Sequence, residues 1–104
     1  MSIERKKYCV NGAWTESKTE KWLPVTDSST GEVIAEVPSC TQEEVLEAID
    51  AADRAFREWS QVSISKRTQL LFKWWNILVA HLDELTELCA KELGKTLDEA
   101  KGDI

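Results

Sequence analysis

Short apolar runs separated by polar or turn-forming residues fill the first 40 positions of the chain. Such runs are typical of strands, and Pro38 ends the last of them. Asn11 and Gly12 suit the positive φ values of a tight turn between the first two runs. Two or three strands are predicted: Lys7–Val10, the extended chain that resumes at Trp14, and Glu32–Val37, which follows Trp22–Val25 and a polar turn. So few strands are marginal alone and need another surface to cover their apolar side.

Apolar residues recur at helical spacing after Pro38. Thr41–Glu44 is a capping box, whose hydroxyl and carboxylate accept hydrogen bonds from free N–H groups at the start of a helix. The positions that then share one helix face are Val45, Ala48, Ile49, Ala52, Ala55, Phe56 and Trp59. Charged residues occupy the opposite face, which predicts an ordinary solvated surface. Ser63 or Ser65 is placed to cap the next helix.

That next helix is apolar on nearly every side. Of the 13 residues from Leu70 to Leu82, 10 are apolar, including Trp74 and Trp75. A helix that is apolar all round is normally covered all round, and a chain this short has little other material to cover it. Helical character continues over Asp83–Leu93, and Gly94 is placed to end it in the left-handed conformation. We therefore expect that a partner surface is missing from this chain.

A second capping box, Thr96–Glu99, opens a further helix close to the last residue. Asp103 and Ile104 are neither the Gly nor the basic residues that commonly end a helix. We therefore expect the chain to be the opening part of a larger protein. Its strands form one block and its helices another, so the fold class is α+β for the fragment, and the chain is compatible with an α/β domain as part of something larger.

The composition is that of one globular domain. With 104 residues, 42% of them hydrophobic and 31% charged, a compact core is expected. A net charge of -6 argues against nucleic acid as a partner, because Lys and Arg supply most of the affinity for phosphates. No apolar stretch approaches a membrane span or a signal peptide, so we expect no membrane partner and a cytoplasmic location.

The cysteines and the single histidine give no clear chemical site. An odd number of widely spaced cysteines fits neither a disulfide framework nor a zinc site and predicts free thiols. Cys40, just before a helix start, is the best placed nucleophile, but it has no basic neighbour in sequence. Cys89 falls on an apolar helix face, and Cys9 has no visible role. His81 is expected to interact with carbonyls at a helix end.

Two further features have simpler structural explanations. Gly94–Thr96 is similar to the end of a phosphate-binding loop, but the earlier Gly is absent and a helix precedes it instead of a strand. Five tryptophans could form a stacking platform, but Trp59 and Trp74 lie on predicted core faces, so packing explains them better. We assign no catalytic, cofactor-binding or metal-binding residue to this chain.

The order of several motifs resembles the start of an NAD(P)-dependent aldehyde dehydrogenase. The motifs are Val10–Trp14, Ser29–Ile34, the Ala-rich helix Ala48–Trp59, Arg67 and Glu92–Lys95. Each is weak alone, but all five occur in the right order and spacing over nearly the whole chain. Glu16–Trp22 and Lys95–Ile104 look most like the CoA-acylating methylmalonate-semialdehyde dehydrogenase branch. Succinate-semialdehyde dehydrogenases are the nearest alternative, through Ala48–Ala52 and Glu99–Gly102.

This resemblance implies that residues 1–104 are the N-terminal part of a coenzyme-binding domain of α/β class, with a β-rich arm over 1–39 and a helical layer over 40–104. It also implies that the full enzyme is a homo-oligomer that uses NAD, with CoA as acyl acceptor. In the family, a cysteine attacks the aldehyde, hydride passes to NAD, and the thioester is released to CoA or water. The residues for these steps lie downstream, so this segment alone should bind no cofactor and be inactive.

Two details of the resemblance concern single positions. Some relatives place a structural monovalent cation near positions that correspond to Thr26 and Asp103. The family often has Asn-Pro-Ala where this chain has Asp27–Ser29, which makes the conformation of that loop an open question. A reading from another class also stays open, in which the chain is a free-standing module that binds a partner through its apolar helix.

Overall fold

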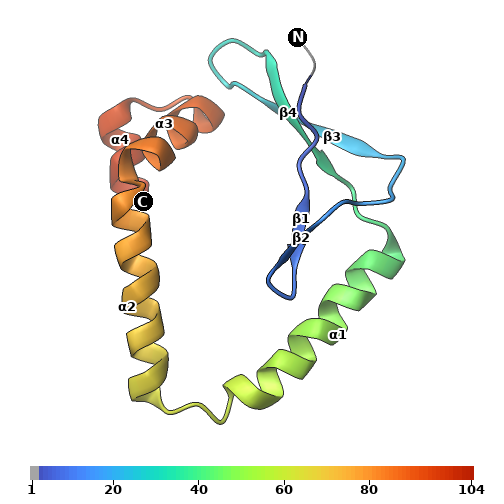
Figure 1. The fold of residues 1–104 in the computed structure, drawn as a ribbon. Helices are drawn as coiled ribbons and strands as arrows, with labels where there is room; N and C mark the ends of the chain where they lie inside the picture. The colour runs from blue at the N-terminus through green and yellow to red at the C-terminus, as the bar shows by residue number, and fades with distance from the viewer. Residues whose placement is uncertain (1–2) are drawn as a thin grey trace. The chain divides into compact units, whose positions relative to one another are not determined.

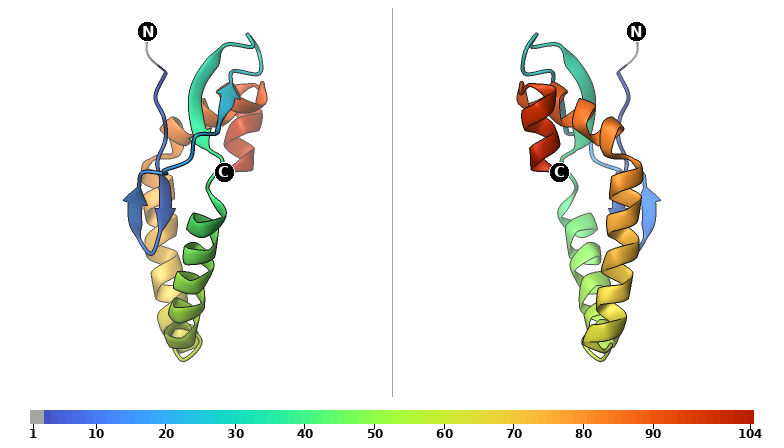
Figure 2. Two further views of the ribbon diagram at one scale, coloured as in Figure 1. Left: turned by 90° about the vertical axis from the view of Figure 1, so that its right-hand side faces the viewer. Right: turned by 90° about the vertical axis from the view of Figure 1, so that its left-hand side faces the viewer.

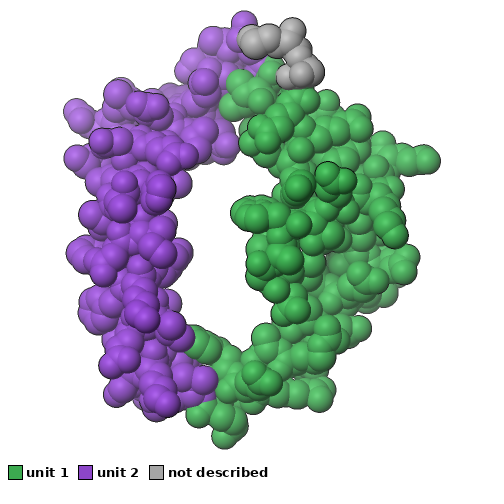
Figure 3. All heavy atoms as spheres, in the orientation of Figure 1, with its two compact units in different colours: residues 1–26, 33–61 green, residues 27–32, 62–104 purple. Residues whose placement is uncertain are grey.

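The computed structural model describes residues 3–104, which form four strands and four helices. The residues divide into two compact units, drawn in different colours in Figure 3. The first contains the strands and the first helix, and the second contains residues 27–32 and 62–104. Figure 1 labels the elements in chain order. The mixed architecture with small antiparallel sheets agrees with the predicted α+β character.

The first unit contains two separate hairpins. Strand β1 (Tyr8–Val10) pairs antiparallel with β2 (Ala13–Thr15). The turn between them has positive φ at both central residues, 50° at Asn11 and 74° at Gly12, as the sequence predicted. This conformation matches the twist of a two-residue hairpin, which explains the Asn-Gly pair.

The second hairpin joins β3 (Trp22–Thr26) to β4 (Val33–Pro38), antiparallel. A third extended segment lies on the other side of β4, where Arg5 and Glu36 form a parallel bridge. The Lys6 N–H donates to the Glu36 carbonyl at 2.8 Å, and the Glu36 N–H donates to the Glu4 carbonyl at 3.0 Å. The guanidinium of Arg5 also stacks 4.8 Å from the centre of the Trp22 ring.

Helix α1 (Gln42–Trp59) begins at the predicted capping box, which is present in full at Thr41 and Glu44. The next helix, α2 (Ile64–Ala80), is capped by the hydroxyl of Ser63, one of the two serines proposed for this role. Figure 2 shows both as continuous helices. The break comes at His81, whose backbone leaves the helical region (φ -108°, ψ 17°), and α3 (Leu82–Leu93) starts there. No Gly or Pro marks this break in the sequence, and apolar spacing alone did not predict it.

The turn of residues 27–32 caps the end of α3. Ser28 donates its N–H to the Lys91 carbonyl at 3.1 Å and its hydroxyl to the Glu92 carbonyl. Asp27 holds the turn by accepting the N–H of Ser29 at 2.8 Å. A proline at position 28 has no backbone N–H to donate, so the serine there is what allows the bond to the Lys91 carbonyl.

After α3 the chain turns sharply into the last helix. Gly94 lies in the left-handed region (φ 70°, ψ 30°), as predicted, and helix α4 (Leu97–Asp103) opens with the Thr96–Glu99 capping box. A Cβ on Gly94 would lie 3.3 Å from the Ser28 Cβ, so the close approach of the turn also favours glycine here. Helix α4 packs against α3 and buries Ala100 completely.

The expectation of a compact core is wrong for this chain by itself. Within residues 3–104 the buried apolar residues are three alanines, Ala35, Ala51 and Ala100. The predicted apolar face of α1 is exposed at Val45, Ile49, Phe56 and Trp59. The helices therefore form through local capping and spacing, while their apolar faces have no covering layer within the described residues.

Candidate functional site

Glu44 is the centre of the densest polar cluster in the first unit. Glu44 is only 8% exposed. Its carboxylate accepts hydrogen bonds from the Ser17 hydroxyl at 2.6 Å, the Lys18 N–H at 3.0 Å and the Thr41 N–H at 2.9 Å. One side chain therefore caps α1 and also fixes the segment between β2 and β3, which is 26 to 27 residues away in sequence.

These hydrogen bonds decide what Glu44 can do chemically. The bond from Ser17, followed by those from Lys18 and Thr41, lowers the pKa of Glu44 from 4.5 to about 2. The pKa of Tyr8, which shares this region, is raised by burial and then by the negative charge of Glu44. A carboxylate so weakly basic is a poor general base near neutral pH. The cluster is therefore a structural anchor.

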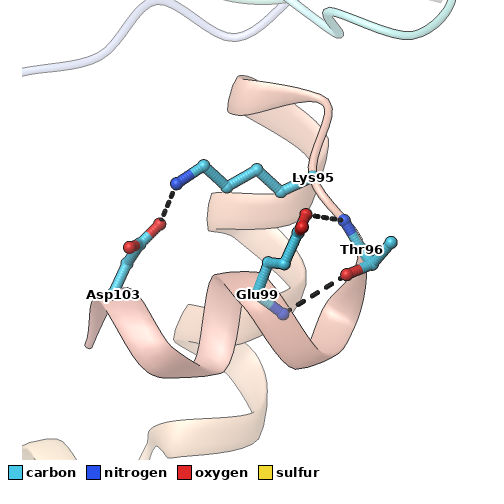
Figure 4. A network of polar contacts seen from close by, with 4 residues as sticks. All are labelled: Lys95, Thr96, Glu99 and Asp103. Carbon is cyan, nitrogen blue, oxygen red and sulfur yellow. Dashed lines mark hydrogen bonds and ion pairs between the residues drawn. The ribbon is translucent and has the colours of Figure 1, made fainter.

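A second network occupies the sequence that is similar to a phosphate loop (Figure 4). The ammonium of Lys95 donates to the Asp103 carboxylate at 2.5 Å, and this bond raises the pKa of Lys95. The Thr96 hydroxyl accepts the Glu99 N–H at 3.3 Å, and the Glu99 carboxylate accepts the Thr96 N–H at 3.4 Å. The Lys95 ammonium and the Thr96 hydroxyl are the groups that could bind a phosphate, and both instead form hydrogen bonds with residues of α4.

The cysteines and the histidine are not brought together into a site. Cys9 is exposed, Cys40 and Cys89 are half-buried, and all three are free thiols. His81 does not turn its ring to carbonyls as predicted; its Nδ1 lies 3.1 Å from the Glu84 carboxylate. Residues 3–104 contain no group of three His, Cys, Asp or Glu side chains arranged for a metal ion. The cation suggested near Thr26 and Asp103 stays a prediction.

The most distinctive surface of the second unit is the apolar face of α2. Trp74 and Trp75 are each 59% exposed, so the prediction that core packing accounts for Trp74 is wrong within the described residues. A hollow of about 280 Å³ lies along this helix, lined by Thr68, Leu71, Phe72 and Trp75. An apolar surface of this extent is typical of a site where another protein surface binds.

One polar atom on the same helix has no partner. The Nε of Arg67 is buried, and none of the described residues accepts a hydrogen bond from it. Buried polar groups are normally paired, because leaving a donor unpaired costs free energy. The sequence marked Arg67 as part of a motif, but only the three-dimensional structure reveals the unpaired atom.

Comparison with known proteins places the chain in a family. Residues 14–104 match the model of the aldehyde dehydrogenase family. The chain belongs to this family. Aldehyde dehydrogenases of the semialdehyde branch are among its relatives, as the motifs suggested. The malonate-semialdehyde dehydrogenase of Lacticaseibacillus casei is 42% identical over 99% of this chain.

Two further aldehyde dehydrogenases extend the comparison. A protein of Aedes aegypti, described as a probable acylating methylmalonate-semialdehyde/malonate-semialdehyde dehydrogenase, is 38% identical over 99% of the chain. A protein from Sinorhizobium meliloti, solved in complex with NAD, superposes over 100% of the chain with a TM-score of 0.88 and 27% identity. The chain matches the N-terminal part of this fold and spans about a fifth of its relatives, 21% for the L. casei protein.

NAD does not fit the residues described here. The sequence has no G-x-G-x-x-G turn, and Gly94–Thr96 is committed to the network around α4. None of the four helices is long and apolar enough to cross a bilayer. That residues 1–104 hold no catalytic or cofactor-binding residue stays a prediction.

Proposed function

We propose that the chain is the N-terminal part of the coenzyme-binding domain of an NAD-dependent enzyme that oxidises methylmalonate or malonate semialdehyde and transfers the acyl group to CoA. The observation that carries this proposal is the 42% identity to the L. casei malonate-semialdehyde dehydrogenase over 99% of the chain. The name of the Aedes aegypti relative supports the acylating step.

In this proposal the chain is inactive alone. Residues 1–39 serve as a β-rich arm and residues 40–104 as a helical layer, while the nucleophile and the cofactor-binding residues come from the remaining four fifths of the enzyme. Cys40 and Cys89 support this division, because neither has a base in hydrogen-bond contact within residues 3–104. The free thiols also favour a cytoplasmic enzyme, which we expect to be a homo-oligomer.

An assay of two proteins tests the proposal. The first is the 104-residue chain alone. The second is a chimera, in which this chain replaces the aligned fifth of the L. casei enzyme. We expect NADH formation from malonate semialdehyde only with the chimera, and mass spectrometry should find acyl-CoA as the product. NADH formation by the chain alone would contradict the proposal, and so would free acid as the sole product in the presence of CoA.

Two alternatives predict other results. The first is a succinate-semialdehyde-type enzyme, in which case a chimera with a succinate-semialdehyde dehydrogenase would be active while the L. casei chimera would not. The free-standing interaction module is favoured by one observation, the exposed apolar surface of α2. It predicts that the chain folds and binds a protein partner with no need of the remaining enzyme, and that neither chimera is active.

A further inference from the structure

The outer edge of β3 is protected by a proline. Pro24 lies opposite Glu36 in the pairing of β3 with β4. The Glu36 N–H and carbonyl both bond away from β3, so this pair exchanges no hydrogen bonds and the Pro24 nitrogen faces the outer edge of β3. Proline has no N–H to offer there, which makes that edge a poor template for another strand.

The outer edge of β4 is covered by residues 4–6, which we call the edge segment (Figure 1). Its two backbone bonds take both the N–H and the carbonyl of Glu36, at 3.0 and 2.8 Å. Arg5 adds two side-chain contacts, because its Nε lies 3.6 Å from the Glu36 carboxylate and its guanidinium stacks on the Trp22 ring. The backbone groups that β4 would present at Glu36 are therefore occupied.

The edge segment is held by few contacts. The Arg5 side chain is 60% exposed, so solvent screens its ion pair with Glu36 and leaves the two backbone bonds as the main attachment. Without the segment, Glu36 would have a free donor and a free acceptor on a six-residue strand whose other residues are apolar. An open strand edge of this kind is a template for pairing with another strand.

We propose that the edge segment is a displaceable third strand that prevents β4 from pairing with the β4 of a second copy of this chain. Two identical edges each offer a donor and an acceptor, and an antiparallel pair satisfies both edges at once. Two Glu36 carboxylates would repel if they lay opposite each other, so Ile34 of each strand lies opposite Glu36 of the other in this pairing. The proposal concerns contacts among residues 4–38 and does not depend on the proposed function.

Two proline substitutions in the 104-residue chain test this proposal. Lys6→Pro removes the N–H that bonds to the Glu36 carbonyl. Lys7→Pro is the matched control, because it removes the same charge while the Lys7 N–H donates to no backbone carbonyl within residues 3–104. Hydrogen exchange of residues 33–38, measured by mass spectrometry at low and high chain concentration, reports the state of β4.

With Lys6→Pro we expect exchange of residues 33–38 at low concentration to be roughly fivefold faster than in the unchanged chain. At high concentration the exchange should slow again, because β4 edges pair, and infrared spectroscopy should show a gain of β-sheet. Association through the apolar face of α2 adds no β-sheet, so the infrared signal separates the two routes. Lys7→Pro should behave as the unchanged chain at both concentrations.

Three results would overturn the proposal. Equal exchange in the two proline variants would show that the edge segment does not protect β4. Fast exchange with Lys6→Pro at every concentration, with no gain of β-sheet, would show that a second copy does not bind there. Arg5→Ser keeps the backbone bonds and should speed exchange by a smaller factor; loss of helix in both this variant and Lys6→Pro would show that the segment is needed for folding instead.

Discussion

Glu44 illustrates what a single side chain determines in this protein. It anchors the segment between β2 and β3 and caps α1, because its two oxygens accept hydrogen bonds from Ser17, Lys18 and Thr41. Its folded-state pKa of about 2 lies below the usual 4.5. The folded state therefore stabilises the ionised form of Glu44 relative to the unfolded state. The resulting stabilisation is complete above about pH 4.5 and is lost as the pH falls through about 2.

This linkage predicts the effect of Glu44→Gln. The amide is uncharged and can accept at only one oxygen, so we expect a lower thermal midpoint of the helical signal at neutral pH. We also expect a smaller loss of helix between about pH 4.5 and about pH 2, measured by far-UV circular dichroism. Glu43→Gln is the control, because Glu43 is an exposed residue of the same helical turn. A variant at Glu44 with the pH profile of the unchanged chain would refute this account.

Residue identity alone predicted part of this chemistry. The capping role of Glu44 follows from its position three residues after Thr41, whereas its bonds to Ser17 and Lys18 depend on the path of the chain. The ring of His81 shows the opposite case. A nearby carboxylate at Glu84 competes with the helix-end carbonyls, and the structure contains the contact between the His81 ring and that carboxylate.

At the scale of elements, the end of α3 depends on a distant donor. Gly94 and Lys95 donate their N–H groups to the Ala90 carbonyl at 2.9 and 3.2 Å, which any helix with a left-handed end can do. The next two carbonyls are capped by Ser28, 64 residues earlier than Glu92. The turn of residues 27–32 is therefore part of the helix end.

Removing the Ser28 hydroxyl should loosen that end. We expect Ser28→Ala to speed amide hydrogen exchange in the last turn of α3 roughly fivefold, which corresponds to about 1 kcal/mol for one hydrogen bond. Ser29→Ala is the matched control, because the hydroxyl of Ser29 donates no hydrogen bond within the described residues. Equal exchange in the two variants would show that the hydroxyl cap contributes nothing measurable.

Elements with local signals were predictable from the sequence. The capping boxes at Thr41 and Thr96, the Asn11–Gly12 turn and the end at Gly94 each depend on residues within four positions. The break at His81 has no Gly or Pro to mark it, so apolar spacing alone did not locate it. The cap from Ser28 is non-local and could not be predicted from spacing.

At the scale of the whole molecule, helix formation and burial are separate. The sequence predicted apolar faces on α1 and α2, and it also predicted that too little material was present to cover α2. The exposure of Trp74 and Trp75 agrees with the second prediction. Core packing could not be assigned from the sequence, because the residues that cover a face need not belong to the chain that carries it. For the same reason Arg67 could be recognised only as a motif residue.

The central claim is that this chain needs the remainder of an aldehyde dehydrogenase to bury its apolar helix faces. Sedimentation velocity of the 104-residue chain over a range of concentrations, with near-UV circular dichroism on the same samples, tests this most directly. We expect concentration-dependent association or a monomer with weak tryptophan dichroism, because exposed tryptophans lack a fixed environment. A monomer at every concentration with sharp near-UV bands would contradict the claim.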